Sequence, residues 1–200
     1  MNTRAYVLDS VRRNQPAATA LPQLPAFPYP GQDLVADFSA ALLRMGGSIV
    51  SVPPQTSLRS FILRRFPHAH VICSATPEVQ GTRSLQAVLD PRELRDVDVG
   101  VVRAAFGVAE TGSVWLSERE FGQNALGFLS QHLVVLLDPA AIVGNLHDAY
   151  RDPGFLQARY AVFMTGPSAT ADIEGVLVRG AQGIRSLTVI PIARQAAQPA

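Results

Sequence analysis

The spacing of apolar residues along the chain predicts alternating helices and strands. Apolar positions recur every three or four residues in segments that predict helices over 3–13, 34–45, 58–66, 139–150 and 170–179. Short apolar runs predict strands over 48–52, 70–73, 97–104, 114–116, 133–137, 160–164 and 187–192. Because helical segments separate many of these strands, we expect βαβ crossovers. The predicted fold class is therefore α/β, with a mostly parallel sheet sandwiched by helices.

A proline-rich arm separates the first predicted helix from the rest of the chain. Prolines recur through residues 16–31, and each fixes its own backbone and disfavours helix at the residue before it. We expect an N-terminal helix and arm over 1–30, one α/β domain over 31–192, and a frayed tail over 193–200. The pattern leaves open whether apolar residues of the arm, Leu21, Leu24 and Phe27, pack against the domain.

The composition is that of a globular protein with an unusual set of cations. Of the 200 residues, 48% are hydrophobic and 16% are charged, which argues against disorder. All 17 basic residues are arginine, so Schiff-base chemistry and a P-loop are excluded because both need lysine. A net charge of +1 argues against nucleic acid as a partner. With no long apolar run and no signal-peptide core, we expect a cytoplasmic protein without membrane contact.

The single cysteine limits the redox chemistry that this chain can perform. Cys73 can neither form an intramolecular disulfide nor supply the ligand set of an iron–sulfur cluster. Its place at the end of a predicted strand indicates a buried structural thiol. The histidines have no metal-ligand spacing, so we expect no metal site and no cofactor on this chain. Any iron–sulfur cluster would then belong to a partner.

Two loops that follow predicted strands are candidate ligand sites, because ligands of open α/β sheets lie outside the carboxyl ends of the strands. The first loop, 107–113, contains Glu110 beside a hydroxyl and a glycine. Such a carboxylate can act as a base or nucleophile, or can bind substrate hydroxyls. The simpler interpretation is that Gly112 makes a tight turn between two strands and Glu110 is solvated.

The second loop joins the strand 160–164 to the helix predicted over 170–179. Ser168 or Thr170 can cap that helix, and Asp172 in its first turn favours the helix dipole. The same hydroxyls and backbone amides can also form a site for a carboxylate or phosphate. Arginines are the remaining candidates for binding an anionic substrate, namely Arg83, Arg103 and Arg119.

Both loops contain the motifs of a known family. The matching residues are Asp98-Val99-Gly100-Val101, Ala109-Glu110-Thr111-Gly112-Ser113, Thr165-Gly166-Pro167-Ser168, Thr170-Ala171-Asp172-Ile173-Glu174, and Gly180 with Gly183. Over residues 30–192 the chain resembles the lactate-utilisation protein C family, or LUD domain. The resemblance implies a fold like that of glucosamine-6-phosphate deaminase, ribose-5-phosphate isomerase and the CoA-transferases. It also implies a catalytic candidate, Glu110, and ligand-binding residues Thr111, Gly112, Ser113, Gly166, Ser168, Thr170 and Asp172.

The function implied by the resemblance is an accessory or substrate-binding role in oxidising L-lactate to pyruvate. The implied partners are cysteine-rich and iron–sulfur lactate-utilisation proteins, together with a small anionic ligand. One alternative is a stand-alone enzyme of the sugar-phosphate isomerase or CoA-transferase type, with Glu110 as base or acyl-accepting nucleophile. Another is a small-anion-binding module without turnover.

The chain departs from the family pattern at two places beside the expected cleft. After Gly180 the family usually has a His-Gly-Pro ending, whereas residues 181–184 read Ala-Gln-Gly-Ile and contain neither the histidine nor the proline. Gln123-Asn124 and Ser130 stand in a stretch that usually contains an arginine and a proline. These departures point to an altered substrate or a loss of activity.

Overall fold

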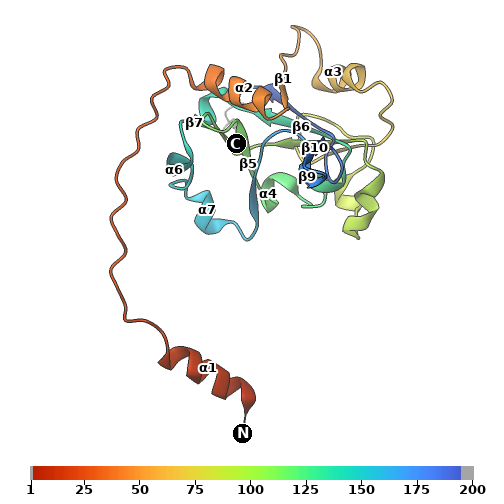
Figure 1. Ribbon diagram of the computed structural model, residues 1–200. Coiled ribbons are helices and arrows are strands. Elements are labelled where there is room, and N and C mark those ends of the chain that lie inside the picture. Colours follow the sequence, from red (N-terminus) through yellow and green to blue (C-terminus); the bar gives the residue numbers. More distant parts are fainter. Residues whose placement is uncertain (1, 195–200) are drawn as a thin grey trace, which may run out of the picture.

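The computed structural model describes residues 2–194, and a five-stranded parallel sheet lies at its centre (Figure 1). The strand order is β1-β11-β6-β3-β2, and all neighbouring strands run parallel. The bounds are β1 Ser48–Ile49, β2 Ile72–Ser74, β3 Val99–Arg103, β6 His132–Leu137 and β11 Ser186–Pro191. The α/β class with a mostly parallel sheet is therefore confirmed. Each of these strands overlaps its predicted range.

A second sheet of four strands packs against one face of the parallel sheet, in the order β7-β4-β5-β8. The bounds are β4 Phe106–Val108, β5 Ser113–Ser117, β7 Ile142–Val143 and β8 Ala161–Met164. Strand β5 runs antiparallel to both β4 and β8, whereas β4 and β7 are parallel. The chain passes from the parallel sheet to the second sheet where β3 leads into β4, and again where β6 leads through a single 3-10 turn into β7. The sequence pattern predicted β5 and β8 but missed β4, which is too short for a periodicity.

Three apolar clusters fill the spaces between these layers. The cluster between the two sheets includes Phe38 and Leu42 of helix α2 (Leu34–Arg44). The other face of the parallel sheet packs against Ile62 of helix α3 (Leu58–Arg65). The outer face of the second sheet, with Trp115, is covered by helices α6 (Leu146–Ala149) and α7 (Gly154–Gln157). Shorter connecting elements are η1 (Leu85–Ala87), η2 (Pro91–Asp96), α4 (Glu118–Phe121), α5 (Leu126–Leu129) and η3 (Pro139–Ala141).

The prediction of a helix over 170–179 is wrong, because this segment forms a β-hairpin. Strands β9 (Ala169–Ile173) and β10 (Val176–Arg179) pair antiparallel. The turn between them places Glu174 at φ 54° and Gly175 at φ 71°, the left-handed conformations typical of a two-residue hairpin turn. Ser168 and Thr170 therefore cap no helix, and no helix N-terminus offers an anion site here.

The single helix predicted over 139–150 is also wrong. Pro139 begins the one-turn η3, and the chain then enters β7 before Gly144 interrupts it. Asn145 starts the short α6 by accepting a hydrogen bond from the amide of Asp148 at 2.9 Å. The helical spacing of the apolar residues therefore spans three different elements.

The proline-rich arm is anchored to the domain only near its end. Helix α1 (Thr3–Arg13) forms as predicted and lies apart from the rest of the molecule, with no buried residue (Figure 1). Leu21 and Leu24 are 91% and 77% exposed. Phe27 stacks on His147, and its carbonyl accepts a hydrogen bond from Nδ2 of Asn145 at 2.7 Å. The arm thus docks on its own domain from Phe27 onward.

Of the tail predicted over 193–200, residues 195–200 lie outside the described part of the chain. Among residues 2–194, no helix is both long and apolar enough to cross a membrane.

Candidate functional site

The two sequence motifs meet through a chain of hydroxyl groups. The hydroxyl of Thr111 donates to Oγ of Ser113 at 2.8 Å, and Ser113 is hydrogen-bonded to Oγ1 of Thr165. Ser113 and Thr165 lie opposite one another at the ends of β5 and β8, whose neighbouring residues Val114 and Met164 are paired. The structure therefore brings the first motif and the start of the second together.

This meeting point lies at the amino end of the parallel sheet. The amide of Ser168 donates to the carbonyl of Ile184, which precedes β11, at 3.0 Å. The backbone of Gly166 packs against Gly47, which precedes β1. Both loops follow strands, as the sequence indicated, but those strands belong to the second sheet. The motifs consequently lie at the edge opposite the carboxyl ends of the parallel strands.

The motif glycines allow two turns to pack closely on the end of helix α2. Gly112 has φ 67°, and a Cβ placed on it would lie 2.2 Å from the amide nitrogen of Leu42. Gly166 has φ 68°, and a Cβ there would lie 2.4 Å from the carbonyl oxygen of Met45. Both the backbone conformation and the lack of space require glycine at these two positions, so no ligand is needed to explain why they are glycine.

Glu110, the predicted catalytic residue, supports the loop on which the arm docks. Its side chain is exposed, and Oε2 accepts a hydrogen bond from the amide of Leu146 at 3.1 Å. Its own amide donates to the carbonyl of Gly144 at 3.0 Å. In this structure Glu110 therefore contributes to the conformation of residues 144–146, next to the contact made by Phe27.

The remaining residues of the implied ligand site lie on the exposed hairpin. The hydroxyl of Thr170, which is half-buried, donates to Oδ2 of the exposed Asp172 at 2.9 Å. Neither has a hydrogen bond to the hydroxyls of Thr111 or Ser113 among the described contacts. Among the described contacts, the Thr170–Asp172 pair is thus not joined to the Thr111–Ser113 pair by hydrogen bonds.

A cleft of about 850 Å³ opens at the opposite end, where the parallel strands finish. Arg103 ends β3, Glu78 follows β2, and Arg194 follows β11. Helix α4 adds Arg119 and Glu120 to the wall. This is the edge of an open α/β sheet at which ligands are expected, and ligand pockets commonly have such a volume.

The inner wall of the cleft is built around Arg103, whose side chain is only 10% exposed. Its Nε donates to Oε1 of Glu78, and its Nη1 donates to the carbonyl of Ile192 at 3.1 Å. The hydroxyl of Thr76 donates to the other carboxylate oxygen of Glu78. Burial alone would raise the pKa of Glu78, but the hydrogen bonds from Thr76 and Arg103 outweigh it and lower the pKa. Glu78 is therefore ionised at neutral pH.

The rim of the cleft carries additional positive charge. Oε2 of Glu120 accepts hydrogen bonds from the backbone amide and the hydroxyl of Ser117, which fixes this carboxylate at the start of α4. Arg119 donates to Oε1 of Gln157 at 3.5 Å. Within residues 2–194, neither Arg119 nor Arg194 forms an ion pair. Arginines thus outnumber carboxylates in the lining, and this excess favours a small anionic ligand.

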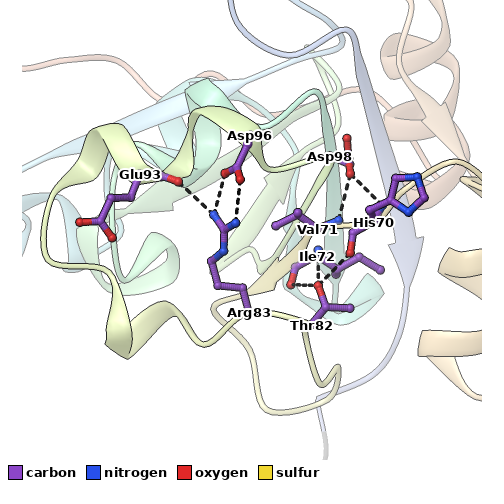
Figure 2. Close-up of polar contacts among 8 residues, drawn as sticks. All are labelled: His70, Val71, Ile72, Thr82, Arg83, Glu93, Asp96 and Asp98. Carbon is purple, nitrogen blue, oxygen red and sulfur yellow. Dashed lines mark hydrogen bonds and ion pairs between the residues drawn. The ribbon is translucent and has the colours of Figure 1, made fainter.

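Arg83, the other arginine predicted to bind an anion, serves a different purpose. Figure 2 shows its guanidinium donating to both carboxylate oxygens of Asp96, at 2.6 and 2.7 Å, and to the carbonyl of Glu93 at 3.0 Å. These bonds tie the loop after β2 to η2. In the same view Asp98 accepts hydrogen bonds from the amides of His70 and Val71. Arg83 does not line the cleft, whereas the predicted Arg103 and Arg119 do.

Sequence reasoning missed four polar residues of this cleft, Thr76, Glu78, Glu120 and Arg194. Thr76, Glu78 and Arg194 lie within four residues after parallel strands, so the same rule about strand ends could have selected these three. Cys73, in contrast, is fully buried as expected of a structural thiol, and burial raises its pKa. The described residues contain no group of three or more His, Cys, Asp or Glu side chains able to hold a metal ion.

Comparison with known proteins supports the family resemblance inferred from the motifs. A family model described as the LUD domain matches residues 46–192. The chain belongs to the LUD-domain family. The LUD domain of this chain includes all five parallel strands, both motifs and most of the cleft. It is similar to the crystal structure of a DUF162 family protein from Deinococcus radiodurans, with 18% identity and a TM-score of 0.63. That match covers 79% of this chain and 95% of the other, whereas no curated protein matches.

The LUD domain also has a hollow of about 500 Å³ at its amino edge, lined in part by His132. The ring of His132 stacks on Phe66, and Nδ1 is 2.8 Å from Oγ of Ser186. Burial, followed by the nearby Arg185 and Arg65, lowers the pKa of His132, while Asp98 opposes them.

We expect His132 to make the fold less stable as the pH falls. The folded state binds this proton less readily than the unfolded chain, so stability is lost as the pH decreases through the ordinary value of about 6.5. The melting temperature should therefore drop between about pH 7.5 and pH 5.5, and it should drop less in His132→Gln. Equal decreases in the two proteins would show that His132 is not the group responsible.

Proposed function

We propose that this LUD-domain protein binds the substrate of a lactate-utilisation system, L-lactate or a related 2-hydroxy acid. The observation that carries the proposal is the nearly buried Arg103 in a cationic cleft at the carboxyl ends of the strands. Arginine recognises carboxylates with paired, charge-assisted hydrogen bonds, and every 2-hydroxy acid has a carboxylate. Family membership supports the choice of lactate among such acids.

The proposal assigns the redox centres to partner proteins. Oxidation of lactate to pyruvate removes two electrons and two protons from the carbon that carries the hydroxyl, and an acceptor must take them. This chain has a single cysteine, which is fully buried, so its residues do not fit the ligand set of an iron–sulfur cluster. We therefore propose cysteine-rich and iron–sulfur proteins as its partners, with this chain in the accessory, substrate-binding role.

The test is a binding experiment on the whole protein. L-lactate and other 2-hydroxy acids are titrated calorimetrically, beside sugar phosphates and acyl-CoAs. Unfolding is measured in parallel with and without ligand. A hydroxy acid at 100 times its dissociation constant should add about 2.7 kcal/mol to the free energy of unfolding. Arg103→Gln should abolish binding, and Arg119→Gln on the exposed rim should weaken it without loss of the fold. Arg92→Gln, an exposed arginine outside the cleft, is the matched control.

Two outcomes would reject the proposal. One is the absence of any binding of 2-hydroxy acids to the wild-type protein. The other is turnover of a sugar phosphate or acyl-CoA that is lost in Glu110→Gln, which would favour a stand-alone isomerase or transferase acting through Glu110.

A further inference from the structure

The hydrogen bonds of Arg103 leave one nitrogen of its guanidinium available. Nε donates to Glu78 and Nη1 donates to the carbonyl of Ile192, whereas Nη2 makes no hydrogen bond with residues 2–194. A carboxylate binds a guanidinium most strongly through two adjacent nitrogens. An incoming carboxylate must therefore pair Nη2 with either Nε or Nη1. The single N–H of Nε is already used by Glu78, and one of the two N–H groups of Nη1 is used by the carbonyl of Ile192.

The two existing partners differ in how readily they can leave. The carbonyl of Ile192 belongs to the backbone beside β6, where its amide donates to the carbonyl of Leu137 at 2.8 Å. Moving this carbonyl would require moving the end of the sheet. Glu78 reaches Arg103 by a flexible side chain from the loop after β2, and that side chain is 31% exposed. Rotation of the side chain is sufficient to release Nε.

We propose that Glu78 occupies the carboxylate-binding position of the cleft, and that the ligand carboxylate displaces it. The ligand then pairs with Nε and Nη2 of Arg103. The hydroxyl of Thr76, which is 7% exposed and donates to Glu78, is released at the same time and becomes a second donor to the ligand. This inference rests on the proposed function, because it assigns the receptor for the acid within the same cleft.

The displacement lowers the measured affinity for any carboxylate. The protein with Arg103 paired to Glu78 does not accept the ligand, so the apparent dissociation constant equals that of the open site divided by the fraction of the protein that is open. Glu78 thus limits occupancy at low ligand concentration. It also restricts entry to ligands whose carboxylate can replace its own.

Glu78→Gln tests this inference directly. A neutral glutamine keeps the shape of the side chain but pairs less strongly with Arg103, so L-lactate should bind roughly tenfold more tightly. The melting temperature without ligand should fall, because Arg103 loses its ion pair, while the shift produced by the ligand should grow. Glu78→Ala, which admits water beside Arg103, should change the affinity in the same direction. Asp96→Asn is the control, since it removes a carboxylate from the Arg83 pair outside the cleft.

The outcomes separate the two proposals. If the wild-type protein binds L-lactate and Glu78→Gln binds it equally or more weakly, the displacement is refuted and the proposed function stands. If neither protein binds L-lactate, the proposed function fails, and acetate serves as a simple carboxylate probe. Tighter acetate binding by Glu78→Gln would still support the displacement, whereas no gain would refute it.

Discussion

Gly112→Ala is expected to lower the free energy of unfolding by about 3 kcal/mol or more. Alanine at φ 67° is strained, and its Cβ would lie 2.2 Å from the amide nitrogen and 2.6 Å from the Cα of Leu42. Those atoms are the backbone of α2, so no side-chain rotation can relieve the contact. The turn or the helix must move, and the packing of α2 against the edge strands β1 and β7 is then disturbed.

Gly175→Ala is the matched control for this prediction. Gly175 has φ 71°, close to that of Gly112, but a Cβ added there has no neighbour within 4 Å. Its loss of stability should be about 1–2 kcal/mol, the cost of the left-handed conformation alone. Urea unfolding of both variants measures the difference. Equal losses would show that close packing on α2 contributes nothing.

Phe38→Ala should destabilise the protein by about 3–5 kcal/mol. The Phe38 side chain is fully buried in the cluster between the two sheets, where it holds α2 in place. Truncation leaves a cavity that the surrounding strands can fill only in part. Phe128→Ala, at a ring that is 38% exposed, should cost less than half as much. Similar losses for both variants, measured by urea unfolding, would contradict the role of Phe38 in holding α2 in place.

The fully buried strands were the easiest elements to predict from the sequence. Strands β3, β6 and β11 are covered on both faces, so most of their positions are apolar. The capping residues Asp33 and Ser57 mark where helices α2 and α3 begin. The β9–β10 hairpin gave no such signal, because its small and branched residues fit a helical spacing as well. Its turn depends on a left-handed Glu174, which the sequence does not specify.

The candidate site could be predicted only in part, because the two ends of the sheet cannot be distinguished from local sequence. The motif loops follow strands, but β4 and β8 belong to a sheet whose pairing joins residues far apart in the chain, such as Val114 and Met164. That pairing carries the loops to the amino edge. Arg103 was selected as a cation, whereas its contact with Glu78 links residues 25 positions apart and required the structure.

The position of the motifs has a practical consequence for mutagenesis. The residues that stand out in the sequence, above all Gly112 and Gly166, pack against α2, whereas the cleft around Arg103 lies at the far end of the same sheet. A panel of variants chosen from the motifs would thus mainly report how much folded protein survives in the cell. Variants at Thr76, Glu78 and Arg119 would instead change the ligand occupancy of the protein that is folded. Normalising any growth phenotype to the amount of folded protein therefore distinguishes the two groups.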